Sequence, residues 1–595
     1  MTDATTASAD LFKAEIVKLL QKHAAADPAE AESRVETPVD YSLGDYAFPC
    51  FFLAKALKKG PAAIAMELAA AIGNDTGRSR LIERVQATGP YVNFFVNKAA
   101  LAAAVISAVE KERDRYGMTF LQAKSSTKKE KANQKTIMVE YFHANTHKAV
   151  HVGHVRNICL GESLCRILEF SGNKLVRVNY QGDIGPHVAK CIWGIRNLNV
   201  GAPPATNRLR WLGNVYVQAN TAVEGNEQLE AEVRQLLLRI YEGDKELNKL
   251  WKETRQWCLD EFDEMYKEFG VRYNEFYFES EVEFEARKIS QQLEKEGIAQ
   301  ESDGAIIMDL KQYKLGVFVL FTKDGTALYS SKDIALARKK MSKYKLDRSI
   351  HVVGREQELH FKQLFKTLEL IGPKEKEFAA KSFHLIYGLV MLPTGKMSSR
   401  AGSVVFYDDL RNELLSIASA EVKKRHDDWN ESQISAAAKK IAFSALKFGM
   451  INRDNDKELV FDWEQAMKLE GETGPYVQYA YARICSIFRK YGKSLPNPNK
   501  TDFSQLTATA AEIKVIKLVK EFPAVVAAAA TQLKPALISR YLLDLAQAFS
   551  NFYNDHPILN AEPAVRDARL LLCAAVKQVL ENGLRLLAID VLEEM

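Results

Sequence analysis

Residues 140–154, with the sequence EYFHANTHKAVHVGH, bring a carboxylate, an amide, a lysine and several histidines into one short segment. The apolar run 136–139 before it predicts a buried strand, and the apolar positions of 155–170 recur at helical spacing. The segment should therefore cross from a strand to a helix that begins near His151. Unpaired N–H groups and the positive dipole end at a helix start favour an anion such as a nucleotide phosphate. Gly153 would let such a ligand approach the backbone closely.

A second segment that could bind phosphates lies far downstream, after the apolar run 384–390, which predicts a strand. The loop that follows this strand contains lysine and serine side chains. A lysine ammonium supplies a point charge and serine hydroxyls donate hydrogen bonds, so the loop can wrap a triphosphate. Each segment alone is a weak signal, because paired histidines are often capping or core side chains and a short polar loop is usually a surface turn. The two segments together, in this order, occur by chance far more rarely than either segment alone. The loop consists of Lys396, Met397, Ser398, Ser399 and Arg400, between Gly395 and Gly402.

Alternating strands and helices must position these two segments. Residues 136–408 show this alternation, which predicts an α/β fold with a Rossmann-like, doubly wound parallel sheet. Ligands of such sheets bind at the carboxyl ends of the strands, where both polar segments are expected. The charged, helix-rich segment at about 195–300 interrupts the alternation, and we interpret it as an insertion into a connection of the sheet.

The flanking regions predict further domains. Residues 1–120 indicate a small α+β domain, joined to the centre by a lysine-rich linker at 121–135. A solvated linker is the plain interpretation of this charge run, and a basic tether that touches a polyanion is the alternative. The remainder is wholly helical, with a connection at 409–470 and an all-α helical bundle at 471–595.

Composition restricts the class of protein. A chain of 595 residues is too long for a single core, and its net charge of +5 permits a nucleic-acid partner without indicating one. The seven cysteines are scattered and form no C-x-x-C pair, so we expect no structural metal. Acidic residues near the N-terminus argue against a secretory or transit signal, and no apolar run approaches membrane-spanning length. We therefore expect a cytoplasmic protein without a membrane partner.

The two polar segments together resemble the signatures of the class I aminoacyl-tRNA synthetases, usually written HIGH and KMSKS. The resemblance implies that the histidines contact the phosphates of ATP, used with Mg²⁺, and that the lysine of the second motif neutralises departing pyrophosphate. Because an amino-acid carboxylate attacks the α-phosphorus, catalysis consists of positioning and charge stabilisation without a protein nucleophile. The residues expected to bind ATP are His151, Gly153, His154, Lys396, Met397, Ser398 and Ser399.

Further motifs resemble one family of that class, the arginyl-tRNA synthetases, over nearly the whole chain. The pattern E-x-x-x-x-N-x-x-K-x-x-H-x-G-H is met by residues 140–154, and G-D-I-G at 182–185 is similar to a G-D-W-G loop. Residues 472–480 resemble the start of the anticodon-binding domain, and 44–47 an N-terminal domain that touches the tRNA elbow. The resemblance implies ATP-dependent ligation of L-arginine to tRNA(Arg) through an arginyl-adenylate. We expect the enzyme to be a monomer.

The same family resemblance, together with the chemistry of guanidinium, predicts an arginine pocket. Guanidinium is planar, permanently charged and carries five donors, so its pocket needs a carboxylate and further acceptors. We assign Asp333 to the guanidinium, with Tyr329 as an acceptor or stacking face. Asn145 and Gln357 should hold the α-amino and carboxylate ends, and Glu140 should contact either a cationic end or both ends. The alternatives are that Asp333 caps the start of a helix and that Glu140 pairs with a nearby lysine.

Three departures from the family pattern concern the site. His143 stands where the family usually has serine, and Ile184 stands where it has tryptophan. Many family members have lost the lysine of the second motif, with an earlier lysine standing in for it, whereas this chain has both. The predicted catalytic residues are Lys148, His151, His154 and Lys396.

Contacts with tRNA are predicted for Tyr476, Gln478 and Tyr541, because aromatic side chains can stack on unpaired anticodon bases. Ordinary packing of the helical bundle is the alternative for each of them. Two other functions fit part of the pattern: a small nucleotidyltransferase, which also uses an H-x-G-H motif, and a synthetase-like binding protein without catalysis. The long helical C-terminus argues against the first, and the retained ATP-site residues argue against the second.

Overall fold

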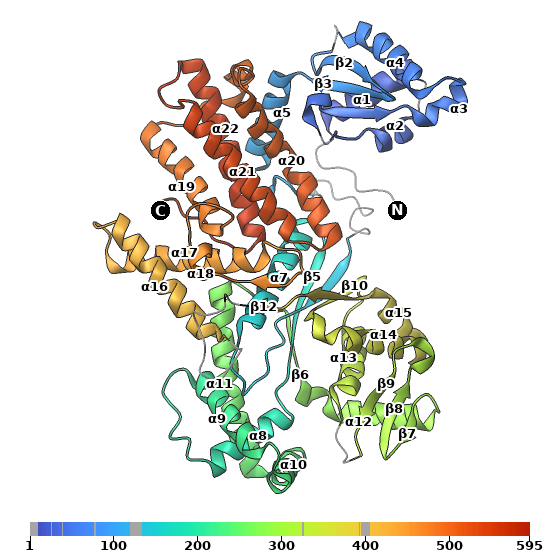
Figure 1. The fold of residues 1–595 in the computed structure, drawn as a ribbon, viewed down its shortest axis with the longest axis vertical. Coiled ribbons are helices and arrows are strands. Elements are labelled where there is room, and N and C mark those ends of the chain that lie inside the picture. Colours follow the sequence, from blue (N-terminus) through green and yellow to red (C-terminus); the bar gives the residue numbers. More distant parts are fainter. Residues whose placement is uncertain are drawn as a thin grey trace.

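The structure, a computed structural model, describes residues 10–24, 27–38, 40–76, 79–118, 134–323, 327–391, 393 and 405–595. Figure 1 shows the N-terminal domain beside a helical bundle at one end of the molecule and two further lobes at the other end. The strands of the central sheet and helix α7 (Val152–Phe170) lie between the bundle and these lobes. The predicted site segment 140–154 thus lies at the middle of the molecule.

The N-terminal domain is α+β, as predicted. Its antiparallel sheet has the order β1-β3-β2, and Gly89 adopts the left-handed φ of +56° in the turn between β2 and β3. Glycine takes this conformation without the penalty that a side chain would bring. The elements are α1 (Leu11–Ala24), α2 (Pro28–Arg34), β1 (Tyr46–Pro49), α3 (Ala54–Leu57), α4 (Pro61–Thr76), β2 (Ile82–Thr88), β3 (Tyr91–Val96) and α5 (Lys98–Glu112).

A five-stranded parallel sheet with the order β11-β10-β4-β5-β6 forms the centre of the catalytic region. Its strands are rich in buried apolar residues, as expected for a sheet covered on both faces. Helix α7 is the crossover from β4 to β5, and it is buried along almost its whole length. The predicted Rossmann-like class is confirmed. The strands are β4 (Thr136–Glu140), β5 (Lys174–Gln181), β6 (Glu275–Phe278), β10 (Arg348–Gly354) and β11 (Ser382–Tyr387).

Two details of the sheet differ from the sequence prediction. Residues 275–278, which fell within the predicted insertion at 195–300, form β6 and pair in parallel with β5. Residues 305–308 and 317–321, expected to continue the alternating sheet, instead belong to a separate antiparallel sheet with the order β7-β8-β9. The short connections between these three strands leave no room for a parallel crossover. They are β7 (Gln300–Ser302), β8 (Ala305–Asp309) and β9 (Val317–Phe321).

Helices surround these sheets on both sides. The segment between β5 and β6 supplies one helical lobe, and the segments after β6, β9 and β10 supply helices of the other lobe. The first group is α8 (Pro186–Asn197), α9 (Arg208–Val223), α10 (Glu227–Tyr241) and α11 (Lys245–Phe269). The second group is α12 (Glu279–Lys295), α13 (Tyr329–Lys343), α14 (Glu358–Ile371) and α15 (Pro373–Lys381).

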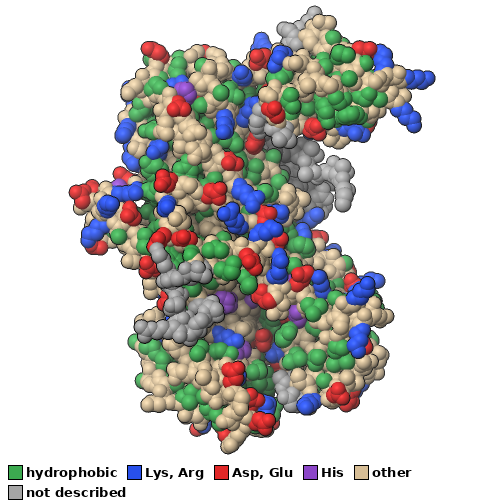
Figure 2. Space-filling view, in the orientation of Figure 1, with side chains coloured by type: hydrophobic (Ala, Val, Ile, Leu, Met, Phe, Trp, Pro, Cys, Tyr) green, Lys and Arg blue, Asp and Glu red, His purple; other side chains and the backbone are tan. Residues whose placement is uncertain are grey.

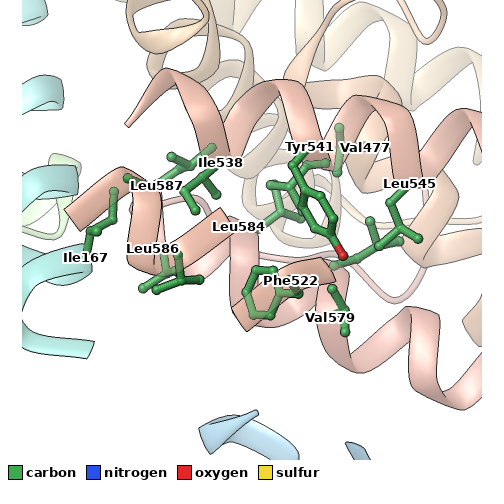
Figure 3. Packing of buried hydrophobic residues seen from close by; sticks show 14 of the residues in the cluster. Ile167, Val477, Phe522, Ile538, Tyr541, Leu545, Val579, Leu584, Leu586 and Leu587 are labelled. Atoms are coloured by element: carbon green, nitrogen blue, oxygen red, sulfur yellow. The ribbon is translucent and has the colours of Figure 1, made fainter. Parts of the chain in front are cut away.

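The C-terminal part is helical, apart from the short parallel pair β12 (Val390–Met391) and β13 (Leu459–Val460). Figure 3 shows its apolar core, where side chains of several helices interlock around Phe522 and Tyr541. Within the described ranges, no helix combines the length and the apolar character needed to cross a bilayer. The helices are α16 (Tyr407–Arg425), α17 (Glu431–Ile451), α18 (Trp463–Ala466), α19 (Gly474–Tyr491), α20 (Ala510–Gln532), α21 (Ala536–Asp555) and α22 (Pro563–Leu586).

Candidate active site

The carboxyl ends of the parallel strands form the edge at which the predicted residues meet. After β4, the chain carries Asn145 past Gly182, the residue that follows β5. A Cβ atom on Gly182 would lie 2.2 Å from Oδ1 of Asn145, so only glycine permits this close approach. The amide N–H of Thr146 donates to the Gly182 carbonyl at 3.0 Å and holds the two segments together. The 140–154 segment and the glycine loop therefore share one side of the site.

Helix α11 fixes the glycine loop at 182–185. The buried carboxylate of Asp183 accepts hydrogen bonds from Arg255 Nε at 2.7 Å and from the Ser280 backbone N–H at 2.9 Å. Trp251 Nε1 donates to the Asp183 carbonyl at 2.7 Å, and Trp251 packs in the same apolar cluster as Ile184. The indole of Trp251, from the helical insertion, thus supports the glycine loop. In that loop, Ile184 stands where the family motif has tryptophan.

The two histidines of the predicted phosphate socket cap the start of α7. His151 is the N-cap residue, and its Nδ1 accepts from the Gly153 N–H at 3.1 Å, while His154 Nδ1 accepts from the His151 N–H at 3.2 Å. Both Nδ1 atoms are therefore unprotonated, and each neutral ring carries its hydrogen on Nε2. Burial lowers the pKa of both rings, and they are 3.9 Å apart between centroids. Two Nε2–H donors are consequently available for phosphate oxygens without an added positive charge.

Lys148 supplies the cation on this side of the site. Its half-buried ammonium lies 4.9 Å from the centre of the Tyr216 ring, a cation–π contact with helix α9. Burial lowers the pKa of Lys148, while the charge of Glu279 opposes this shift. In sequence, Lys148 stands between Asn145 and the α7 cap, in a stretch that is not helical.

Most of the predicted arginine-binding residues line a cavity of about 160 Å³, namely Glu140, Tyr329, Asp333 and Gln357. Asp333 lies inside α13, so the alternative that it caps the start of this helix is wrong. Its Oδ2 is 2.7 Å from His360 Nε2, and the His360 ring lies 4.8 Å from that of the exposed Tyr329. Gln357 borders the same cavity. Figure 2 shows histidine, acidic and basic side chains in the hollow between the two lower lobes.

Glu140 lines the cavity, but both of its oxygens already have partners. Oε2 accepts from the buried Lys340 ammonium, and Oε1 is 3.0 Å from His351 Nδ1. Burial alone would raise the pKa of Glu140, yet Lys340 and His351 hold it well below its usual range. The structure thus realises the alternative of a strand-end carboxylate paired with a lysine. The carboxylate in the cavity with an oxygen to spare is Asp333.

Several residues of the site carried little or no sequence signal. His360 stands in a Q-x-x-H-F pattern with Gln357 that resembles a family motif, but only the fold places its ring against Asp333. Lys340 and His351 lie far from Glu140 in sequence and nothing in their local pattern marked them. The same holds for Lys332, whose buried ammonium pairs with Glu283 at 2.8 Å and Glu279 at 3.1 Å. Tertiary contacts alone reveal this second ion-pair group beside the site.

The second predicted phosphate segment lies outside the described residues, so the contacts of Lys396, Met397, Ser398 and Ser399 with ATP stay predictions. The chain after it returns to the α7 cap. Val152 N–H donates to the Val405 carbonyl at 3.0 Å, and Tyr407 N–H donates to the Val150 carbonyl at 2.9 Å. The end of the loop region is therefore hydrogen-bonded to the first phosphate segment.

Two of the three predicted tRNA contacts are corrected by the structure. Tyr541 is 5% exposed and donates from its hydroxyl to the Leu518 carbonyl at 2.7 Å, within the core that Figure 3 shows. Gln478 is fully buried and donates to the Asp590 carbonyl at 2.6 Å. Both side chains pack the helical bundle and offer no surface to a base. Tyr476 is half-buried, with its hydroxyl near Gln547, and its tRNA contact stays a prediction.

Comparison with known proteins assigns a family to each part of the chain. Residues 9–96 match the arginyl tRNA synthetase N terminal domain, 118–463 match the tRNA synthetases class I (R) catalytic domain, and 477–595 match the DALR anticodon binding domain. The three matches follow one another in the order that the sequence motifs indicated.

Whole-length relatives agree with these domains. An arginine–tRNA ligase of Clostridium perfringens is 35% identical over 590 residues, covering 98% of this chain and 100% of the relative. One of Bdellovibrio bacteriovorus is 37% identical over 566 residues, covering 94% of this chain and 93% of the relative. The arginyl-tRNA synthetase of Thermus thermophilus superposes with a TM-score of 0.76 at 26% identity, covering 98% and 99% of the two chains. This chain belongs to the class I arginyl-tRNA synthetase family.

Proposed function

We propose that this enzyme ligates L-arginine to tRNA(Arg) for protein synthesis, using ATP and passing through an arginyl-adenylate. The observation that carries the proposal is one juxtaposition at the carboxyl edge of the sheet. A cavity with the Asp333–His360 pair lies beside the segment whose histidines present Nε2–H donors at the start of α7. A guanidinium and a nucleotide phosphate can therefore bind to neighbouring parts of one edge.

In the first step, the arginine carboxylate attacks the α-phosphorus of ATP, which is used as its Mg²⁺ complex. The new C–O–P bond forms as the bond to the β-phosphate breaks, and pyrophosphate leaves. His151 and His154 donate to phosphate oxygens, and the Lys148 ammonium offsets the developing negative charge. Lys396 shares this work in the loop at 396–399. Asn145 and Gln357 orient the α-amino and carboxylate ends, so that the attacking oxygen faces phosphorus.

In the second step, the arginyl group passes from the adenylate to the 2′-hydroxyl of the terminal adenosine of tRNA, and AMP leaves. Activation is proposed to require bound tRNA. Residues 471–595 bind the anticodon, with Tyr476 at the surface, and residues 1–120 contact the tRNA elbow. The family matches to 477–595 and 9–96 support this division of the chain.

The proposal includes a cytoplasmic location and a monomeric state. All seven cysteines are buried and unpaired by disulfides, which is typical of proteins in a reducing compartment. Size-exclusion chromatography with light scattering measures the mass of the particle, and the monomer predicts the mass of one chain. A particle of twice that mass at working concentration would contradict this part of the proposal.

The pocket assignment is tested by ATP–pyrophosphate exchange in the presence of tRNA. Asp333→Ala removes the carboxylate that faces guanidinium and should lower kcat/KM for arginine by about 10²–10³-fold, because a buried charged contact is lost. The KM for ATP should stay within about threefold. Asp309→Ala, a half-exposed carboxylate on β8, is the matched control and should resemble the parent. Parent-like use of arginine by Asp333→Ala would overturn the assignment.

A further inference from the structure

The backbone makes an unusual bend directly after β4, at Phe142 and His143. Their φ angles are +83° and +52°, which L-residues rarely adopt and which persist only where the surrounding structure enforces them. Packing around Phe142 holds the bend. Its N–H donates to Asn157 Oδ1 of α7 at 2.6 Å, and its ring contacts Phe262 and Tyr266 of α11 edge-on. With Phe142 fixed in the core, the next side chain, His143, lines the arginine cavity.

His143 contributes one of three buried polar atoms that have no hydrogen-bond partner among the described side chains lining the cavity. Another is Nδ1 of His360, a ring that already bonds to Asp333 through Nε2. The Nε2 of His143 is buried and has no hydrogen-bond partner among the described residues, and the same is true of the Tyr180 hydroxyl. The other acceptors nearby are partly or wholly engaged: Glu140 by Lys340 and His351, and Asp333 through Oδ2 by His360. A buried polar atom without a partner is unfavourable, because it has lost its hydrogen bonds to water. A ligand that offers N–H groups here would offset that loss.

The protonation states of these two side chains suit an acceptor role. Burial lowers the pKa of His143 even though Glu140 raises it, so the imidazole is neutral and keeps one nitrogen lone pair. Burial keeps Tyr180 as a phenol, with its pKa well above the usual value, and the phenol oxygen can accept. A guanidinium offers five N–H donors and no acceptor. The unpaired atoms of His143 and Tyr180 thus complement the proposed substrate side chain.

We propose that His143 is a specificity-determining residue whose Nε2 accepts a hydrogen bond from a guanidinium N–H, with the Tyr180 oxygen as a second acceptor beside Asp333. This inference rests on the proposed function and assigns a role to a histidine at a position where the family usually has serine. The arrangement also predicts discrimination against citrulline. Its neutral ureido group carries a carbonyl oxygen in place of one guanidinium nitrogen, so it offers fewer N–H donors to these acceptors and no charge to Asp333.

The test is the KM for arginine in tRNA aminoacylation, measured for the full-length chain. His143→Phe keeps a ring but removes the acceptor, and it should raise this KM by about tenfold, with kcat within about threefold of the parent. His143→Gln restores an acceptor and should return the KM to within about threefold of the parent. Citrulline, assayed as a competitive inhibitor, should bind His143→Phe better relative to arginine than it binds the parent. The matched control is His384→Phe, a half-buried histidine of β11 that does not line the cavity.

The inference is overturned if His143→Phe keeps a parent-like KM for arginine, or if His143→Gln is impaired as strongly as His143→Phe. It is also overturned if the KM for ATP rises as much as that for arginine, because the ring would then act at the nucleotide. A melting temperature near that of the parent for each variant shows that the fold is retained, so that a changed KM reports on the cavity. A parent enzyme that does not charge arginine at all would instead refute the proposed function, which separates the two failures.

Discussion

At the scale of single residues, Glu140 and Lys340 form a buried ion pair whose role in stability is distinct from the substrate recognition proposed for Asp333. The ammonium and the carboxylate are each almost fully buried, and His351 occupies the other carboxylate oxygen. Removing one partner of a buried ion pair leaves the other charge without compensation. Glu140 therefore holds β4, β10 and α13 together beside the cavity, whereas Asp333 is the carboxylate proposed to face the ligand.

Glu140→Gln should lower the free energy of unfolding of the catalytic domain by about 3–5 kcal/mol, because the Lys340 charge stays buried without a carboxylate. Thermal unfolding followed by circular dichroism at neutral pH measures the loss. The double variant Glu140→Gln with Lys340→Met removes both charges and should melt at a higher temperature than the single variant. Equal melting temperatures of the parent and Glu140→Gln would show that the pair contributes little.

The same pair gives a pH dependence with a fixed sign. The pKa of Glu140 in the folded chain lies well below its usual range, so its stabilising contribution is complete above the unfolded value of about 4.3. The contribution is lost as the pH falls below that value toward the folded pKa. The difference in melting temperature between the parent and Glu140→Gln should therefore shrink on acidification below about pH 4. A difference that grows instead would contradict the lowered pKa.

The sequence predicted single residues unevenly. Asn145, His151 and His154 share a short segment, so their spacing was visible and the structure brings them to one strand edge. Asp333 was assigned to the pocket by motif, while its partner His360 needed the fold to place it. Gln478 and Tyr541 could not be told apart from surface residues, because a helix bundle buries polar and aromatic side chains in register with apolar ones.

At the scale of elements, a buried arginine of α7 connects the proposed phosphate site to the helical C-terminus. Arg156 is fully buried, and its Nη1 donates to the carbonyls of Gly388 at 2.7 Å and Lys457 at 2.8 Å. Asp454, in the same segment as Lys457, pairs with Arg540 of α21 at 3.0 Å. The planar guanidinium thus joins α7 to the segments just before β12 and β13, and Asp454 in the second of these segments pairs with the bundle.

Arg156→Lys should lower kcat for arginyl-tRNA formation by about 10–100-fold, because an ammonium cannot reproduce the planar fork and the α7 cap shifts. The KM for arginine should change little, since the cavity is built from other elements. Arg166→Lys on the same helix, which contacts the carbonyls of Gly270 and Arg585, is the matched control and should retain kcat. A parent-like kcat in Arg156→Lys would show that this arginine does not position the α7 cap for catalysis.

The elements themselves were largely predictable, and their pairing was less so. Alternating segments correctly indicated the parallel sheet, yet β8 and β9 were assigned to it because periodicity does not show which strands pair. Their connection, residues 310–316, is too short for a parallel crossover, so connection length could have separated them. β6 was missed because it is only four residues long and is surrounded by charged helices.

At the scale of the whole molecule, the N-terminal domain is docked on the bundle by charged contacts. Lys517 of α20 lies 2.6 Å from Asp45, and Lys520 lies 3.6 Å from Asp10 and also bonds to Tyr46. Local sequence pattern could not predict this arrangement, since these partners are more than four hundred residues apart. The contacts fix the spacing between the two domains proposed to bind the tRNA elbow and the anticodon.

Lys517→Ala should raise the KM for tRNA by about three- to tenfold, because a looser domain pair must be ordered when tRNA binds. The KM values for arginine and ATP should remain those of the parent, since the catalytic site lies elsewhere. Steady-state aminoacylation at varied tRNA concentration measures the change. Raised salt screens the charged contacts and should bring the KM for tRNA of the parent closer to that of the variant. An unchanged KM for tRNA would mean that the docking does not matter for binding.

The most direct test of the proposed activity is aminoacylation of total tRNA by the purified chain, with each proteinogenic amino acid supplied in turn as a radiolabelled substrate together with ATP. If the Asp333 pocket reads guanidinium, arginine alone should be transferred to acid-precipitable tRNA, and pyrophosphate exchange should appear only when tRNA is added. Transfer of lysine, glutamate or another amino acid in place of arginine would contradict the assignment.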